Sequence, residues 1–271
     1  MVRQLLHVLS PKLQSLRAVA RNGSRGRGAR IVLLSIVGAI FWLFVFGVTY
    51  RLLTYFRNVP EIGTLLAAKL LGLVLVSFIG LLLLSNVITA LSTFFLARDL
   101  DLLVGTPVDW LSVYCAKLIE TLVNSSWMVV LMAFPIFTAY GIAYDGGWWY
   151  PLVALAAVIP FLIIPAAIGA ALTLVLVNIF PARRTRDILS VITVFAAGGV
   201  ILAFRLLRPE RLARPEGFRS LVDFLAVLRI PASAWLPSDW VQTGVLGWLR
   251  YEPDVLPFYL LWSTAAAFVV L

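Results

Sequence analysis

Long apolar runs constrain this chain more than any other feature of its sequence. A helix that crosses the hydrocarbon core of a bilayer needs about 20 mainly apolar residues. Several runs approach or exceed that length, and none alternates as the strands of a membrane barrel do. We expect six spans, at about residues 31–53, 65–96, 111–140, 152–180, 188–207 and 255–271. The last run reaches the end of the sequence without a flanking charge, so we expect the full-length chain to continue beyond Leu271.

Composition agrees with a membrane environment. The chain is 62% hydrophobic and 13% charged, whereas soluble domains average about 45–50% and about 25%. The predicted fold class is therefore all-α, a polytopic transmembrane helix bundle in the cell (plasma or inner) membrane. The net charge of +9 is explained by anionic lipid and by loop topology, so no nucleic-acid partner is expected.

The N-terminal segment sets the expected orientation. Residues 1–30 are basic and amphipathic, and the first acidic residue of the chain is Glu61. Because cytoplasmic segments are enriched in Lys and Arg, this segment should be cytoplasmic, and residues 31–271 should form the membrane domain. Residues 1–30 can be interpreted either as an interfacial helix or as a mobile basic tail that only sets topology. The basic loop with Arg183, Arg184 and Arg186 would also be cytoplasmic, but basic residues in 208–253 conflict with an outside location.

Motifs for catalysis are missing from the sequence. It contains no G-x-x-x-x-G-K-[ST] phosphate loop, no H-E-x-x-H and no G-x-S-x-G, which are the short signatures of nucleotide, zinc and acyl-transfer sites. His7 and Cys115 are each the sole residue of their type, so neither a disulfide nor a metal cluster is expected. We expect no catalytic residues, no metal and no cofactor on this chain.

Polar residues recur on one side of two predicted spans. Ser85, Asn86, Thr89, Ser92 and Thr93 share a helical face in the second span. In the third, the polar set is Lys117, Glu120, Thr121, Asn124, Ser125 and Ser126. Polar side chains in a span should point into a bundle or cavity. They read either as part of a translocation path, with Asn86, Thr89, Lys117, Glu120, Asn124 and Ser125 as candidates, or as interhelical hydrogen bonds.

The fourth predicted span combines proline with small residues. Pro160 and Pro165 each remove a helix hydrogen bond, and a small-residue stretch follows at 166–171. Small residues allow neighbouring helices to approach closely. The pattern is typical of a closely packed helix, in a moving or in a static bundle.

Residues 97–110 interrupt the apolar pattern between the second and third spans. Arg98, Asp99 and Asp101 alternate with Leu100, Leu102 and Leu103. The alternation predicts a short amphipathic helix that Gly105 ends, with Thr106 as the N-cap of the next helix. An ordinary solvated loop would account for the same charges.

Two segments carry a resemblance to a known family. LARDLDLLVGTPVDWLSVYCAKLIETLVNSSWMVVLMAFPIFTAYG at 96–141 and FPARRTRDIL at 180–189 resemble permease subunits of ATP-binding-cassette exporters of the type 2 superfamily. The resemblance implies that Arg98, Asp99, Leu100, Asp101, Leu102 and Leu103 form the coupling helix that docks on a separate ATPase subunit. It also implies that ATP and Mg²⁺ bind to that partner, and that a second permease unit completes the transporter.

The resemblance therefore predicts a permease component that moves an unidentified substrate across the plasma membrane, with no ATPase activity of its own. Two alternatives stay open. An ion-gradient-driven secondary transporter would need an ionisable residue deep in a span, and only Lys117 and Glu120 come near that requirement. A non-transporting membrane scaffold or assembly factor would need no ATPase partner.

Overall fold

The computed structural model describes residues 25–58, 62–95, 110–179 and 235–270. These residues form six helices and no strand, which confirms the all-α prediction for this part of the chain. The helices are α2 (Arg25–Arg57), α3 (Gly63–Phe95), α5 (Trp110–Ala143), α6 (Tyr150–Ile179), α10 (Pro237–Leu249) and α11 (Leu256–Val270). The predicted fifth span at 188–207 and the N-terminal segment 1–24 lie outside the described residues.

Four of these helices, α2, α3, α5 and α6, are long and apolar enough to cross a membrane. They contain 30 to 34 residues each, or about 45–50 Å at 1.5 Å per residue. Helices satisfy their backbone hydrogen bonds internally, which is the condition for placing a chain in hydrocarbon. Apolar composition and helix length are thus consistent with a membrane location.

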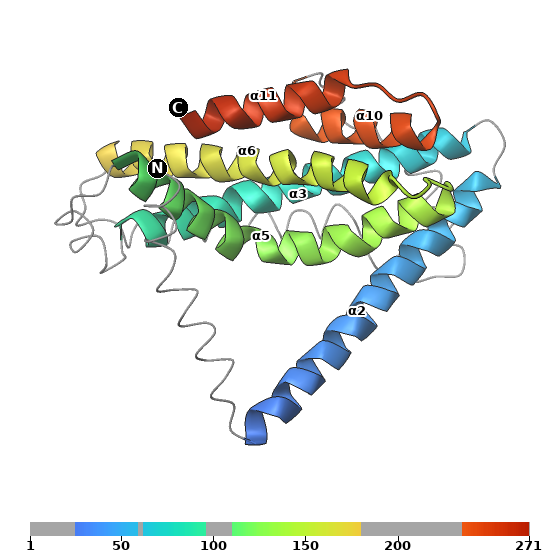
Figure 1. Cartoon of the computed structure of the whole chain (residues 1–271), viewed down its shortest axis with the longest axis horizontal. Helices are drawn as coiled ribbons and strands as arrows, with labels where there is room; N and C mark the ends of the chain where they lie inside the picture. The colour runs from blue at the N-terminus through green and yellow to red at the C-terminus, as the bar shows by residue number, and fades with distance from the viewer. Residues whose placement is uncertain (1–24, 59–61, 96–109, 180–234, 271) are drawn as a thin grey trace.

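The long helices α3, α5 and α6 lie side by side and alternate in direction, with the α10–α11 hairpin against α6 (Figure 1). Both hairpin helices are short, at 13 and 15 residues. The core between the helices is mainly apolar, with a smaller set of buried polar residues. Its largest fully buried side chains include Tyr140, Phe56, Phe161 and Leu71.

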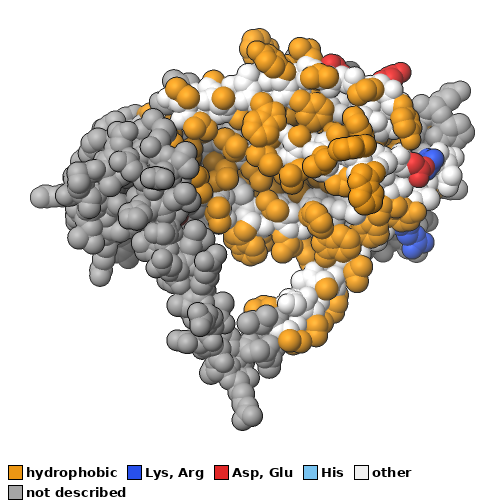
Figure 2. Space-filling model, in the orientation of Figure 1, with side chains coloured by type: hydrophobic (Ala, Val, Ile, Leu, Met, Phe, Trp, Pro, Cys, Tyr) orange, Lys and Arg blue, Asp and Glu red, His pale blue; other side chains and the backbone are white. Residues whose placement is uncertain are grey.

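Helix α2 differs from the others because only its C-terminal half packs on the bundle. Leu53 and Phe56 are fully buried, whereas Leu33, Leu34 and Phe44 are at least 60% exposed. Figure 1 shows the N-terminal half of α2 leaning away from α5, and Figure 2 shows that the side chains along it are mainly apolar. An exposed apolar helix of this length is compatible with lipid rather than with water.

Three turns meet at one end of the bundle. Arg57 at the end of α2 donates hydrogen bonds to the Ala143 carbonyl (2.8 Å) and to Asp145 Oδ2 (3.1 Å). The Tyr251 hydroxyl donates to the Asp145 carbonyl (3.2 Å), and Trp248 Nε1 donates to the Gly146 carbonyl (3.1 Å). These contacts place the α10–α11 turn beside the α5–α6 turn, at the same end of the molecule.

The close approach of α6 to α3 depends on small residues. Ala166, Ala167 and Ala170 are buried, and a Cβ added to Gly169 would lie 2.7 Å from the Cβ of Asn86. Only a residue without a side chain fits there. Pro160 and Pro165 lie inside α6 without ending it, and α5 contains a further proline, Pro135.

Gly169→Ala should destabilise the bundle, because the added methyl group meets Asn86 and the backbone of α3. Overpacking of this kind costs about 1–3 kcal/mol. Thermal unfolding in mild detergent would measure the change.

Gly80→Ala on α3 is the matched control, since a Cβ at Gly80 has no atom within 4 Å. It should leave the unfolding temperature unchanged or raise it, because Ala favours the helix by about 1 kcal/mol. Equal effects of the two substitutions would contradict the close α3–α6 packing.

Candidate functional site

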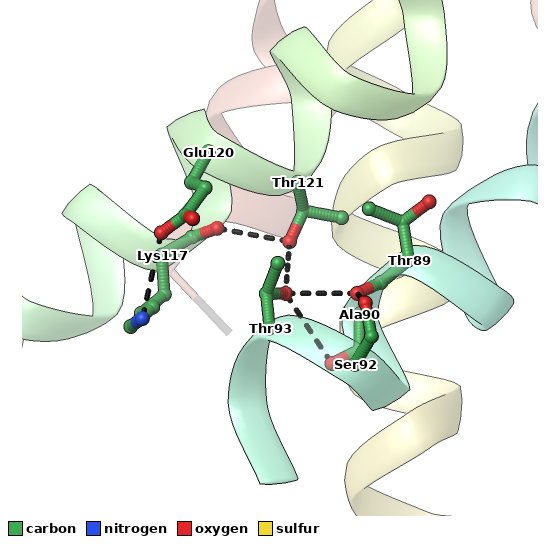
Figure 3. A network of polar contacts seen from close by, with 7 residues as sticks. All are labelled: Thr89, Ala90, Ser92, Thr93, Lys117, Glu120 and Thr121. Carbon is green, nitrogen blue, oxygen red and sulfur yellow. Dashed lines mark hydrogen bonds and ion pairs between the residues drawn. The ribbon is translucent and has the colours of Figure 1, made fainter. Parts of the chain in front are cut away.

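Hydroxyl groups connect α3 and α5 near the ends of these helices that lie opposite the three turns. Thr93 Oγ1 on α3 and Thr121 Oγ1 on α5 lie 2.8 Å apart, and both residues are buried (Figure 3). Thr121 also donates to the Lys117 carbonyl (2.9 Å), while Thr93 contacts the Thr89 carbonyl (3.0 Å). Each threonine thereby joins its own helix to its neighbour.

Asn86 forms a second polar contact between the same helices. Its Oδ1 accepts a hydrogen bond of 2.6 Å from Ser125 Oγ, and its Nδ2 donates to the Leu82 carbonyl at 2.7 Å. The Asn86 side chain is fully buried. Because Gly169 of α6 packs directly on Asn86, this amide lies where three helices meet.

Lys117 and Glu120 form an ion pair on α5. Lys117 Nζ lies 3.4 Å from Glu120 Oε2, and the two side chains are 5% and 23% exposed. A buried charge is costly unless it is paired. The carboxylate therefore compensates the ammonium group close to the threonine contact (Figure 3).

The remaining sequence-predicted residues differ in their relation to this network. Ser85 Oγ on α3 donates to the Ser125 carbonyl of α5 at 3.4 Å and therefore belongs to it. Asn124 is exposed, and Ser92 is exposed and donates to the Thr89 carbonyl of its own helix. The predicted coupling residues Arg98, Asp99, Leu100, Asp101, Leu102 and Leu103 lie outside the described residues, as do Arg183, Arg184 and Arg186.

One member of the polar set was missed from the sequence. Thr173 on α6 is buried and contacts the Val87 carbonyl of α3 (3.3 Å) and the Gly169 carbonyl (2.7 Å). Its place four residues after Gly169, on the small-residue face of α6, was the available signal.

The contacts described in this network are hydrogen bonds and one ion pair. Within the described ranges, no three His, Cys, Asp or Glu residues are grouped so as to hold a metal ion. Most hydroxyls contact a backbone carbonyl of their own helix or a neighbouring helix. The arrangement is suited to fixing the relative positions of α3, α5 and α6.

Comparison with known protein families gives one result. The model of a family described as "Putative ATP-binding cassette" matches residues 24–271. The chain belongs to this ATP-binding-cassette family. Membership implies that the protein works with an ATP-binding-cassette transporter partner. No curated protein and no solved structure matches the chain.

The family match corrects the interpretation of the chain as a permease subunit. The matching family is described as an ATP-binding cassette and not as a permease, so both that resemblance and the predicted function of moving a substrate are contradicted. The resemblance depended largely on a charged loop between two apolar runs. Any membrane protein needs such charges to keep a loop in water, and this common requirement makes the pattern a weak basis for a family assignment.

Removing the Asn86–Ser125 hydrogen bond should weaken the α3–α5 contact. In a double-mutant cycle with Asn86→Ala and Ser125→Ala, we expect a coupling energy of about 0.6 kcal/mol, the average for hydrogen bonds between membrane helices. Unfolding of the four proteins in detergent would measure it.

Asn124→Ala provides the control for this cycle, because Asn124 is exposed on the same helix. Its combination with Asn86→Ala should be additive, as expected for sites that share no contact. A coupling energy of zero between Asn86 and Ser125 would refute the hydrogen bond.

Proposed function

We propose that this chain is the membrane-embedded anchoring component of an ATP-binding-cassette assembly, and that a separate subunit binds Mg²⁺ and ATP. The family match is the reason for proposing an ATP-binding-cassette assembly. One observation supports assigning membrane anchoring and ATP binding to different chains: four long apolar helices occur together with a sequence that has no phosphate loop.

The phosphate loop matters because of its chemistry. A glycine-rich loop presents backbone N–H groups to the phosphates, and the lysine after its last glycine reaches the β- and γ-phosphates. In this chain Lys12 follows Pro11, while Lys69 and Lys117 each follow alanine. No lysine of the sequence therefore stands in the required position after glycine, which favours nucleotide binding on another polypeptide.

We propose a cytoplasmic N-terminus on the basis of charge. The basic segment at residues 1–30 favours a cytoplasmic N-terminus. With α2 crossing outward, the end that joins Arg57, Asp145 and Tyr251 faces the opposite side. In this orientation the C-terminal end of α3 at Phe95 and the start of α5 at Trp110 face the cytoplasm, which is where we propose that the ATPase docks.

The isolated chain should not bind ATP. Equilibrium binding of a fluorescent ATP analogue with Mg²⁺, measured on the detergent-purified chain, should show no saturable signal. Saturable binding that unlabelled ATP displaces would overturn the proposed division of labour.

The chain purified from native membranes should retain a soluble ATPase, identified by mass spectrometry. Asp99 and Asp101 lie in the segment that connects α3 to α5, so Asp99→Lys with Asp101→Lys should reduce the retained ATPase.

Glu252→Lys with Asp254→Lys is the matched control. It makes the same double charge reversal in the α10–α11 turn, at the opposite end of the helices. Retention should be unaffected there. Equal retention by both double variants would argue against contact at 97–110, and an ATPase-free preparation of the unmodified chain would contradict the assembly.

A further inference from the structure

An apolar groove runs between α5 and α6, outside the polar network. It has a volume of about 290 Å³, and its lining residues include Val130, Phe134, Phe137, Ile142, Gly147 and Val158. Phe134 and Leu155 are 64% and 56% exposed, so the groove opens onto the outer surface of the bundle. Its only side-chain hydroxyls belong to Thr138 and Tyr150, and both donate to backbone carbonyls of α5, at Phe134 and Phe137.

The length of the groove matches one leaflet of a bilayer. Along α5 it extends from Ile142, next to the turn, to Val130, a rise of about 18 Å at 1.5 Å per residue. Half of the hydrocarbon core is about 15 Å thick. A groove that begins at the turn and ends near mid-helix has a length suited to one extended acyl chain.

Polar groups lie at the turn end of the groove and not at its deep end. Arg57 donates a hydrogen bond to the carbonyl of Ala143, the residue after the groove-lining Ile142. It also forms an ion pair with Asp145, which lies two residues before the groove-lining Gly147. The two side chains are 55% and 71% exposed, so both charges remain accessible to a headgroup. An exposed pair of a cation and an anion is complementary to the phosphate and ammonium of a zwitterionic phospholipid.

Aromatic residues mark the same level. Trp148, beside the groove-lining Gly147, is 91% exposed, and Trp149 is 63% exposed. Indole rings in such positions are typical of the headgroup region of a bilayer, where one edge is apolar and the other is wet. The turn end of the groove is thereby placed at the depth of lipid headgroups.

We propose that this groove is a binding site for one phospholipid of the leaflet at the turn end, with an acyl chain between α5 and α6 and the phosphate at Arg57. The proposal rests on the membrane embedding stated above as the proposed function. The lipid proposal adds a specific ligand to the membrane-embedded chain. The acyl chain would pack along Phe134, Phe137 and Val158, and the headgroup would be held by charge at Arg57 and Asp145.

The test is native mass spectrometry of the full chain after exchange into detergent containing palmitoyl-oleoyl phosphatidylethanolamine. The unmodified chain should carry one bound phospholipid. Thr138→Phe should lose it, because the ring fills the groove at half depth, and Val158→Phe should lose it by filling the deep end from α6. Val123→Phe, an exposed position on α5 outside the groove, should keep it.

The contact between Arg57 and the phosphate is tested by comparing a phospholipid with a diacylglycerol. With dioleoylglycerol in place of the phospholipid, retention should fall in the unmodified chain, since the phosphate is missing. Arg57→Gln should abolish the preference for phospholipid over diacylglycerol. Equal retention of both lipids by the unmodified chain would overturn the role of Arg57.

Three results would overturn the groove site itself: no phospholipid on the unmodified chain, equal retention by Val123→Phe and both groove variants, or a lipid-free dimer that occupies the groove with a second copy. Should Thr138→Phe fail to fold, Val158→Phe decides. Extraction of membranes with alkaline carbonate separates the two proposals. A chain that stays in the membrane but carries no phospholipid refutes only the groove site, and a chain released by carbonate refutes the membrane embedding as well.

Discussion

The close contact between α6 and α3 at Gly169 is the interaction on which the rest of the described structure depends. A Cβ at this position would lie 2.7 Å from the Cβ of Asn86, so the two helices approach as closely as they do only because Gly169 has no side chain. In the proposed membrane location, lipid is as apolar as the helices themselves, so burial of apolar surface does not drive their association. Tight van der Waals packing and interhelical hydrogen bonds must provide it, and both are concentrated here: Asn86 is packed by Gly169 and bonded to Ser125 of α5.

The two ends of the bundle are built differently. At one end, threonine and asparagine side chains join α3 to α5, and the Lys117–Glu120 pair compensates a buried charge. At the other end, backbone carbonyls of the α5–α6 turn accept hydrogen bonds from Arg57, Trp248 and Tyr251. The turn contains Asp145 at φ 52° and Gly147 at φ 74°. Aspartate and glycine tolerate this left-handed region better than other residues. Burial raises the pKa of the neighbouring Tyr144 phenol above its ordinary value, so this phenol is uncharged at neutral pH.

Family membership and structure together limit what this chain does. The match assigns the chain to a family described as a putative ATP-binding cassette, while its apolar helices are suited to a membrane. The proposed anchoring role reconciles the two without requiring a phosphate loop, a motif that the sequence does not contain. The interpretation as a permease was wrong because it was inferred mainly from a charged loop. Charged residues keep any loop of a membrane protein in water, so they do not identify a particular partner.

The sequence by itself determined the helical class and the positions of four helices that are long and apolar enough to cross a membrane, because a long apolar run has only one common solution in lipid. It also indicated the polar faces around Asn86, Lys117 and Thr121, since helical periodicity can be read from spacing alone. Only the tertiary structure decided which polar residues meet. Asn86 pairs with Ser125, Thr173 joins α6 to α3, and Asn124 is left exposed, because these outcomes depend on the rotation of each helix about its axis. The contact between Arg57 and Asp145, 88 residues apart, and the groove between α5 and α6 likewise follow from how separate helices are placed, which local sequence does not specify.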